Sequence, residues 1–136
     1  MFELFTHRYQ GFEPSMGVPV RITLGAPRWT LPYTLEHQVR EAAPSREYFG
    51  AARTVYEAAY LAQLDRHGVD FFASRFQEIA VAARDLRLVL LCFEDLSKPE
   101  QWCHRRMFAA WWREKTGVKV RELGPLGPGY EQGTLL

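Results

Sequence analysis

The 136-residue chain has little of several features that would identify a protein class. Its two cysteines are too few for a disulfide-rich secreted scaffold, so we expect two free thiols in a cytoplasmic protein. The chain has no basic-then-apolar leader and no run of about 18 apolar residues, which predicts a soluble protein without membrane contact. Seventeen basic and sixteen acidic residues leave a net charge of +1, so no strong overall field predicts general nucleic-acid binding.

The chain does contain enough apolar sequence for one packed domain. Hydrophobic residues make up 47% of it and aromatic residues 14%. A chain of this length buries about two thirds of its unfolded surface, so stability requires neither a metal nor a disulfide. We expect a single domain over residues 1–123 and a poorly ordered tail, rich in Gly and Pro, over residues 124–136.

The apolar periodicity predicts alternating strands and helices. Residues 86–93 carry an almost unbroken apolar run, which is typical of the central strand of a parallel sheet because both faces are covered. This order predicts a single three-layer α/β domain, with a mostly parallel sheet flanked by helices in a Rossmann-like arrangement. The other elements that we expect are strands at residues 2–6, 18–24 and 118–122 and helices at residues 45–68 and 70–84.

Two alternatives stay open for the start of the last helix. Ser97 and Glu100 have the spacing of a capping box, with Pro99 between them, which predicts one continuous helix to Thr116. In the second alternative a short turn precedes a helix that begins at Cys103. The choice decides whether the Cys103 sulfur meets the free backbone amides of a helix N-terminus.

Two short segments carry a family resemblance. The strand end Leu90-Leu91-Cys92-Phe93-Glu94 and, nine residues later, Cys103-His104-Arg105 resemble a bacterial and phage family, domain of unknown function number 488. An arginine after an apolar strand, Arg21, and the nearby Pro27-Arg28 extend the match to most of the chain, with Pro19 where the family often has an acidic residue. The resemblance implies an α/β fold but no settled activity, and it implies one site formed by Cys92, Glu94, Cys103, His104 and Arg105.

The arginines at the predicted strand ends indicate an anion site. Arg21 and Arg28 follow one strand, and Arg105 and Arg106 lie near a helix start, so these arginines can converge on a phosphate or carboxylate. The alternative is that Arg105 forms a buried ion pair with Glu94 and only ties loop to helix. Two aromatic residues of the long connection, Trp29 and Tyr33, are expected to line a pocket at the mouth of the sheet.

The two cysteines allow three interpretations. Cys103 is a candidate nucleophile at a helix N-terminus, although adjacent helical residues diverge by about 100 degrees, which places His104 badly as its base. We favour a packed Cys103 and a core Cys92, and a redox pair of the two thiols is a weaker third possibility. Cys92, Glu94, Cys103 and His104 offer metal ligands, but their spacing matches no common zinc pattern, so we expect no metal and no other cofactor.

The leading hypothesis is a domain that binds a phosphorylated, nucleotide-like small molecule. Hydrolysis or group transfer would use Glu94 and His104 as acid or base, with Cys103 as support or nucleophile; whether the chain is an enzyme stays open. The alternative is a non-enzymatic module for nucleic acid or a protein, with a structural Cys-His-Arg motif. Trp111 and Trp112 are adjacent on one helix, so we expect one of them to face outward, where it could cover a homodimer partner.

Overall fold

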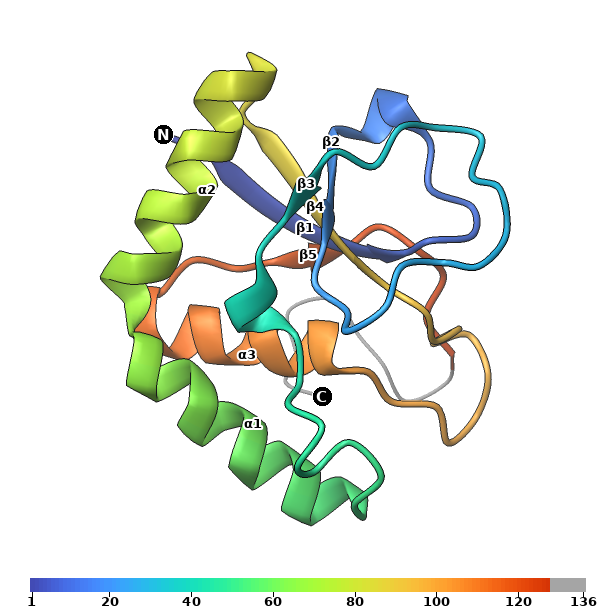
Figure 1. Cartoon of the computed structure of the whole chain (residues 1–136), viewed down its shortest axis with the longest axis vertical. Coiled ribbons are helices and arrows are strands. Elements are labelled where there is room, and N and C mark those ends of the chain that lie inside the picture. The colour runs from blue at the N-terminus through green and yellow to red at the C-terminus, as the bar shows by residue number, and fades with distance from the viewer. Residues whose placement is uncertain (128–136) are drawn as a thin grey trace.

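The computed structural model describes residues 1–127, which contain one five-stranded sheet and three α-helices (Figure 1). All strand pairs are parallel, and the order across the sheet is β3-β2-β4-β1-β5. The α/β fold with a parallel sheet is therefore confirmed. The elements are β1 (Glu3–Arg8), β2 (Val18–Arg21), β3 (His37–Gln38), α1 (Arg53–His67), α2 (Val69–Ala83), β4 (Arg87–Cys92), α3 (His104–Thr116) and β5 (Arg121–Glu122), with short 3₁₀ turns at Pro14–Met16 and Arg40–Ala42.

Strand β4 lies at the centre of the sheet, between β1 and β2, as its apolar run predicts. Every residue of β4 after Arg87 is buried, so both faces of the strand are covered. Leu88 and Leu90 point to the large core formed with all three helices. Val89 and Leu91 point to the opposite face and belong to a second, smaller cluster. The alternation along β4 thus joins the two cores of the domain.

Helix α3 is buried on more sides than its sequence predicts. Trp111 and Trp112 are only 3% and 5% exposed, so the expectation that one of them faces outward is wrong. The Trp111 indole N–H donates to Asp65 of α1 (2.8 Å), and the Trp112 ring packs against Phe76 of α2. Because α1 and α2 both contact α3, they cover flanks of α3 that the sheet alone would leave open.

The second face of the sheet is covered by loops. Tyr9 and Phe12 come from the loop after β1, and Tyr33 comes from the long connection after β2. They pack over Val89 and Leu91, and the Tyr33 hydroxyl donates to the Tyr9 carbonyl (2.7 Å). The three layers of the domain are therefore helices, sheet and ordered loops.

The predicted helix start at Ser45 is wrong, because helix α1 begins only at Arg53. The Ser45 hydroxyl accepts a hydrogen bond from the Glu47 N–H (3.2 Å) inside a turn instead of capping a helix. The Tyr48 hydroxyl then donates to Gln63 of α1, which folds residues 45–52 back along the helix. A hydroxyl that bonds its local backbone competes with helix formation in this way.

The two edges of the sheet differ in how well they were predicted. Strand β5 forms one edge, as expected for residues 118–122, although only Arg121 and Glu122 pair with β1. Strand β3 forms the other edge and is too short to leave a periodic pattern in the sequence. The first part of the predicted tail is described, and its Gly127 N–H donates to the Leu96 carbonyl (2.8 Å); residues 128–136 lie outside the described residues.

The topology brings three chain segments together at the carboxyl ends of the strands. The carboxyl ends of β2 and β4 are adjacent, since Arg21 pairs with Leu91. The loop after β4 runs to the N-terminus of α3 beside them (Figure 1). Ligands of parallel α/β sheets bind at such strand ends.

Within the described residues, no helix is long and apolar enough to cross a membrane.

Gly17 lies at the opposite, amino-terminal ends of β2 and β4, where the backbones approach closely. This residue has a φ of +141°, and a Cβ added to it would lie 2.6 Å from the Arg87 carbonyl oxygen. We expect Gly17→Ala to lower the free energy of unfolding by about 1–3 kcal/mol, measured by urea denaturation. Gly50→Ala, where a Cβ meets open space, is the control. Equal stability of the two variants would contradict the close approach of β2 to β4.

Candidate functional site

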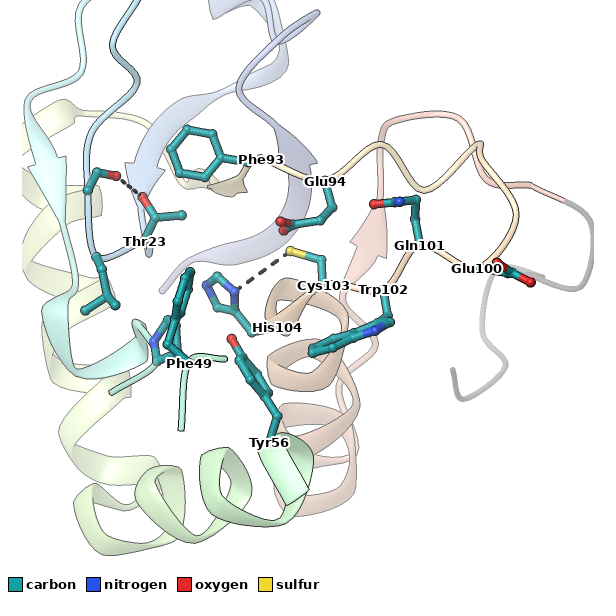
Figure 2. A pocket seen from close by; sticks show the side chains of 13 residues that line it. Thr23, Phe49, Tyr56, Phe93, Glu94, Glu100, Gln101, Trp102, Cys103 and His104 are labelled. Carbon is teal, nitrogen blue, oxygen red and sulfur yellow. Dashed lines mark hydrogen bonds between the residues drawn. The ribbon is translucent and has the colours of Figure 1, made fainter. Parts of the chain in front are cut away.

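A pocket of about 310 Å³ lies where the sequence places the site, at the strand ends and the start of α3 (Figure 2). Three of the predicted site residues, Glu94, Cys103 and His104, line it. We call it the strand-end pocket. Its lining consists of Thr23, Leu24, Gly25, Pro44, Phe49, Tyr56, Phe93, Glu94, Glu100, Gln101, Trp102, Cys103 and His104.

Cys103 is the N-cap residue of helix α3. Its backbone is extended (φ −148°, ψ 142°), and its sulfur accepts a hydrogen bond from the Arg105 N–H (3.5 Å). The continuous helix predicted from Ser97 is therefore wrong, and the alternative with a preceding turn is confirmed. The Ser97 N–H and hydroxyl both donate to the Asp95 carboxylate, which forms a local turn. Glu100 has a φ of +67°, which a right-handed helix excludes.

His104 is fixed by a hydrogen bond to the residue that follows β2. Its Nε2 lies 2.5 Å from the Ile22 carbonyl oxygen, and since a carbonyl only accepts, Nε2 carries the proton. The unprotonated Nδ1 then faces the Cys103 sulfur at 3.9 Å (Figure 2). The expectation that His104 diverges from Cys103 is wrong, because an extended N-cap residue does not follow helical geometry. Burial lowers the pKa of His104 to about 4.

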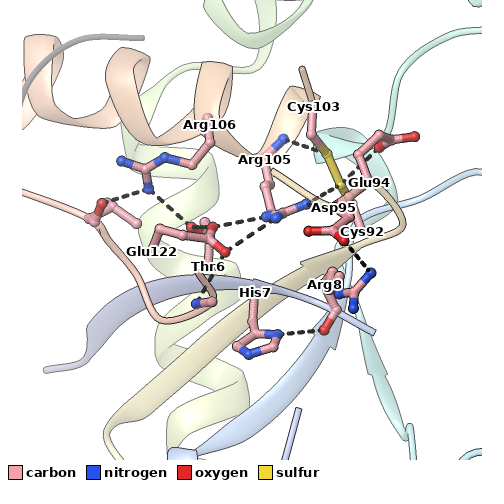
Figure 3. A network of polar contacts seen from close by, with 12 residues as sticks. Thr6, His7, Arg8, Cys92, Glu94, Asp95, Cys103, Arg105, Arg106 and Glu122 are labelled. Carbon is pink, nitrogen blue, oxygen red and sulfur yellow. Dashed lines mark hydrogen bonds and ion pairs between the residues drawn. A yellow bond between two sulfur atoms is a disulfide. The ribbon is translucent and has the colours of Figure 1, made fainter. Parts of the chain in front are cut away.

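Cys92 ends β4 directly behind the pocket, and its sulfur meets that of Cys103. The two sulfurs form a disulfide in the structure, so the expectation of two free thiols is wrong (Figure 3). The Cα atoms are 7.4 Å apart. The usual span of a disulfide is about 4.4–6.8 Å. The favoured interpretation of a packed Cys103 and a core Cys92 is confirmed, since both residues are buried in one cluster, and the two are also paired, as in the third interpretation.

Arg105 is a buried connector rather than a pocket residue. Its guanidinium forms a bidentate ion pair with Glu122 of β5 (2.9 and 3.2 Å), with both side chains at most 1% exposed (Figure 3). A third nitrogen donates to the Glu94 carbonyl (2.9 Å) and to the Cys92 sulfur (3.2 Å). The prediction that Arg105 pairs with the Glu94 carboxylate is wrong. The ion pair with Glu122 joins the start of α3 to β5, and the other guanidinium bonds connect Arg105 to the end of β4.

Glu94 presents its carboxylate to the pocket, next to the sulfurs. One carboxylate oxygen is 3.3 Å from the Cys92 sulfur, so a Cys92 thiol would donate to it in the reduced chain. Burial raises the pKa of Glu94 above its ordinary value, with the nearby Arg105 acting in the opposite direction. Burial also raises the pKa of Tyr56, whose hydroxyl points toward His104 in Figure 2. Both pKa values are raised for the same reason, because burial removes the charged form from water.

The remaining predicted site residues lie outside the strand-end pocket. Arg21, Trp29 and Tyr33 line a second, more open pocket of about 500 Å³. The Arg21 guanidinium donates to the carbonyls of residues 23 and 24, and the Trp29 ring contacts Phe93 of the first pocket (6.0 Å between centroids). Arg28 is exposed and outside both linings. Within residues 1–127, the predicted arginines therefore do not converge on one point.

Sequence reasoning missed the aromatic wall and the partner of Arg105. Phe93 and Trp102 directly adjoin Cys92 and Cys103, so their place in the motif segments could have indicated them. Phe49 and Tyr56 reach the pocket from a different part of the chain, and no local pattern marks them. Glu122 likewise lies 17 residues after Arg105, on another element.

No family model matches the chain, and no curated protein and no solved structure matches it. The resemblance to domain of unknown function number 488 stays a prediction. The chemistry of the site therefore has to carry the functional inference.

The neutral state of His104 gives a pH-dependent stability. An unfolded histidine has a pKa of about 6.5, so between that value and about 4 the unfolded chain binds more protons. The free energy of unfolding should therefore fall as the pH drops through this window, by about 3 kcal/mol in all. We expect His104→Gln to lack this fall while retaining a donor for Ile22, measured by urea unfolding at a series of pH values. Parallel curves for both proteins would contradict the buried neutral imidazole.

Removal of the Arg105 side chain should act on stability. Arg105→Ala leaves the buried Glu122 carboxylate without its guanidinium partner, which typically costs about 3–5 kcal/mol. We expect that loss in chemical denaturation, whereas Arg121→Ala, at an exposed position of β5, should change stability by at most about 0.5 kcal/mol. An Arg105→Ala protein as stable as the control would show that the ion pair does not hold the site together.

Proposed function

We propose that this domain binds a nucleotide-like small molecule, with its flat base in the strand-end pocket. The observation that carries the proposal is the combination of aromatic walls with Glu94, Cys103 and His104 at the carboxyl ends of parallel strands. A volume of about 310 Å³ is sufficient for a single heterocycle. A cytoplasmic location, which the low cysteine content favours, would keep the site reduced.

The aromatic side chains support a flat ligand. Phe49 and Phe93 are 60% and 40% exposed although large and apolar, and they border the same cavity as Tyr56 and Trp102. Exposed apolar rings around a cavity are unusual on a soluble domain unless a ligand or partner covers them. Stacking of a base on such a ring typically contributes about 1–3 kcal/mol.

The polar groups support recognition of a base edge and a proton-transfer role. The Glu94 carboxyl can accept from, or donate to, the nitrogen edge of a heterocycle, and its raised pKa suits an acid–base group. In hydrolysis or group transfer, the reduced Cys103 sulfur at the α3 N-terminus would be the covalent group, and His104 Nδ1 the acceptor of its proton.

Arg21 supports a place for the phosphate. The Arg21 pocket adjoins the strand-end pocket across the Trp29–Phe93 ring pair. A guanidinium has five N–H donors, and Arg21 bonds two carbonyls, so it retains donors for an anion. A ligand whose base lies in the first pocket and whose phosphate lies in the second would use both sets of predicted residues.

A ligand panel tests this proposal. We expect nucleosides or nucleotides to raise the unfolding temperature of the wild-type protein, because ligand at about a hundred times its dissociation constant contributes about 2.7 kcal/mol. Phe49→Ala should weaken the binding of the best compound by about 5- to 100-fold in calorimetric titration, through lost stacking. Leu86→Ala, an exposed apolar position at the opposite end of β4, should leave the affinity unchanged.

Two results would count against the proposal. One is the absence of stabilisation by any nucleoside or nucleotide, and the other is equal affinity of the Phe49→Ala and Leu86→Ala proteins. Stabilisation by oligonucleotides alone, weakening steeply between about 50 and 200 mM salt, would instead favour a nucleic-acid-binding module.

A further inference from the structure

Three potential ligand atoms converge at the back of the strand-end pocket. Cys92 Sγ, Cys103 Sγ and His104 Nδ1 all lie within 4.8 Å of one another, and all three residues are buried. We propose that, in the reduced chain, these three atoms bind one zinc-class divalent ion whose fourth coordination position opens to the pocket.

Cys103 Sγ and His104 Nδ1 already have the spacing of a tetrahedral site, and reduction would free the two bonded sulfurs to separate around an ion. Zinc bonds of about 2.3 Å to sulfur and about 2.0 Å to nitrogen imply separations of about 3.5 Å between sulfur and nitrogen and about 3.8 Å between two sulfurs. The distance from Cys103 Sγ to His104 Nδ1 is 3.9 Å. The 7.4 Å between the Cα atoms of Cys92 and Cys103 exceeds the usual disulfide span, and an ion between the sulfurs would suit that wider separation.

The surroundings of His104 prepare its Nδ1 for a metal. Metal-bound histidines generally donate their other N–H to a carbonyl or carboxylate, which fixes the tautomer and the orientation of the ring. The Ile22 carbonyl accepts such a bond from Nε2, and the Tyr60 ring lies edge-on to the imidazole (5.5 Å between centroids). The ring is thus held with its lone pair toward the two sulfurs before any ion arrives.

Both sulfurs also have the donors that thiolate ligands require. The Arg105 backbone N–H donates to Cys103 Sγ, and the Arg105 guanidinium donates to Cys92 Sγ. Glu122 pairs with the Arg105 guanidinium, and two thiolates with a neutral imidazole would offset the charge of a divalent ion. Such neutrality matters in a buried site, where an uncompensated charge is costly.

The open position follows from the lining of the pocket. Cys103 and His104 line the cavity, whereas Cys92 lies behind it. The Glu94 carboxylate also lines the cavity, next to the Cys103 sulfur, but it does not belong to the three-residue ligand group (Figure 2). Three protein ligands plus water is the arrangement of catalytic zinc, and a carboxylate beside it can accept the proton of the bound water. This assignment rests on the proposed binding of a base, and it makes the reaction a hydrolysis at a heterocyclic ring in which Cys103 and His104 are zinc ligands instead of nucleophile and base.

The disulfide and the metal are alternative states of the same two sulfurs. Oxidation to the disulfide removes both thiolates, so the oxidised chain has only the His104 nitrogen left to offer. Oxidised glutathione would carry out this change, taking up two electrons and two protons from the thiols to give two molecules of glutathione. The ion should therefore bind only to the reduced protein.

Cobalt(II) titration of the reduced full-length chain tests the proposal without any organic ligand. We expect one equivalent to bind with the visible bands of tetrahedral cobalt and a near-ultraviolet thiolate charge-transfer band, and zinc to displace it. Cys92→Ser, Cys103→Ser and His104→Gln should each weaken binding by at least about 100-fold. His67→Gln, an exposed histidine on α1, should bind like the wild type.

Oxidation provides a test that no variant's misfolding can obscure. Wild-type protein treated with oxidised glutathione should lose the cobalt spectrum, and re-reduction should restore it. The proposal is overturned if the reduced wild type binds no cobalt, binds it without the thiolate band, or binds it equally well when oxidised. Metal binding with no response to nucleotides would retain this site and reject the proposed ligand, whereas nucleotide binding without metal would do the reverse.

Discussion

The buried ion pair between Arg105 and Glu122 is the interaction on which the site depends. Two charges removed from water are stable only with close geometry and further hydrogen bonds, and Arg105 has both. Arg105 connects three elements, since its guanidinium bonds Glu122 of β5 and the Glu94 carbonyl just after β4, while its backbone lies in the first turn of α3. This residue therefore fixes where α3 begins relative to the sheet, and with it the position of Cys103.

The chemistry of the pocket follows from that placement. An extended Cys103 at the N-cap turns its sulfur toward Cys92. The first helical residue, His104, is held by the carbonyl of Ile22, the residue that follows β2. All three of these residues, Cys92, Cys103 and His104, are buried. The aromatic residues instead supply the exposed part of the pocket, where Phe49 and Phe93 could adapt to a ligand. A rigid polar base with a partly exposed aromatic rim suits the binding of a flat molecule over a reactive centre.

Sequence patterns predicted the parts of this structure that repeat locally. The apolar run of β4 predicted its central position, because burial on both faces leaves no polar alternation. Patterns failed where a distant residue decides. Ser97 does not cap a helix, because its hydroxyl donates to Asp95 in a local turn. The partner of Arg105 is Glu122, on a strand of only two residues. The convergence of Cys92 with the Cys103-His104 pair was equally beyond the spacing rules, because an N-cap and a strand end meet only in the folded chain.

The fold itself holds the His104 imidazole neutral, with Nδ1 unprotonated and facing the two sulfurs. The most direct measurement is the ¹⁵N chemical shifts of the His104 ring in isotope-labelled, reduced, metal-free protein across about pH 5 to 8, the range in which an ordinary histidine titrates. The structure predicts a protonated Nε2 and an unprotonated Nδ1 throughout, with no titration in this range. A ring that carries its proton on Nδ1, or that titrates near its ordinary pKa of about 6.5, would contradict the account.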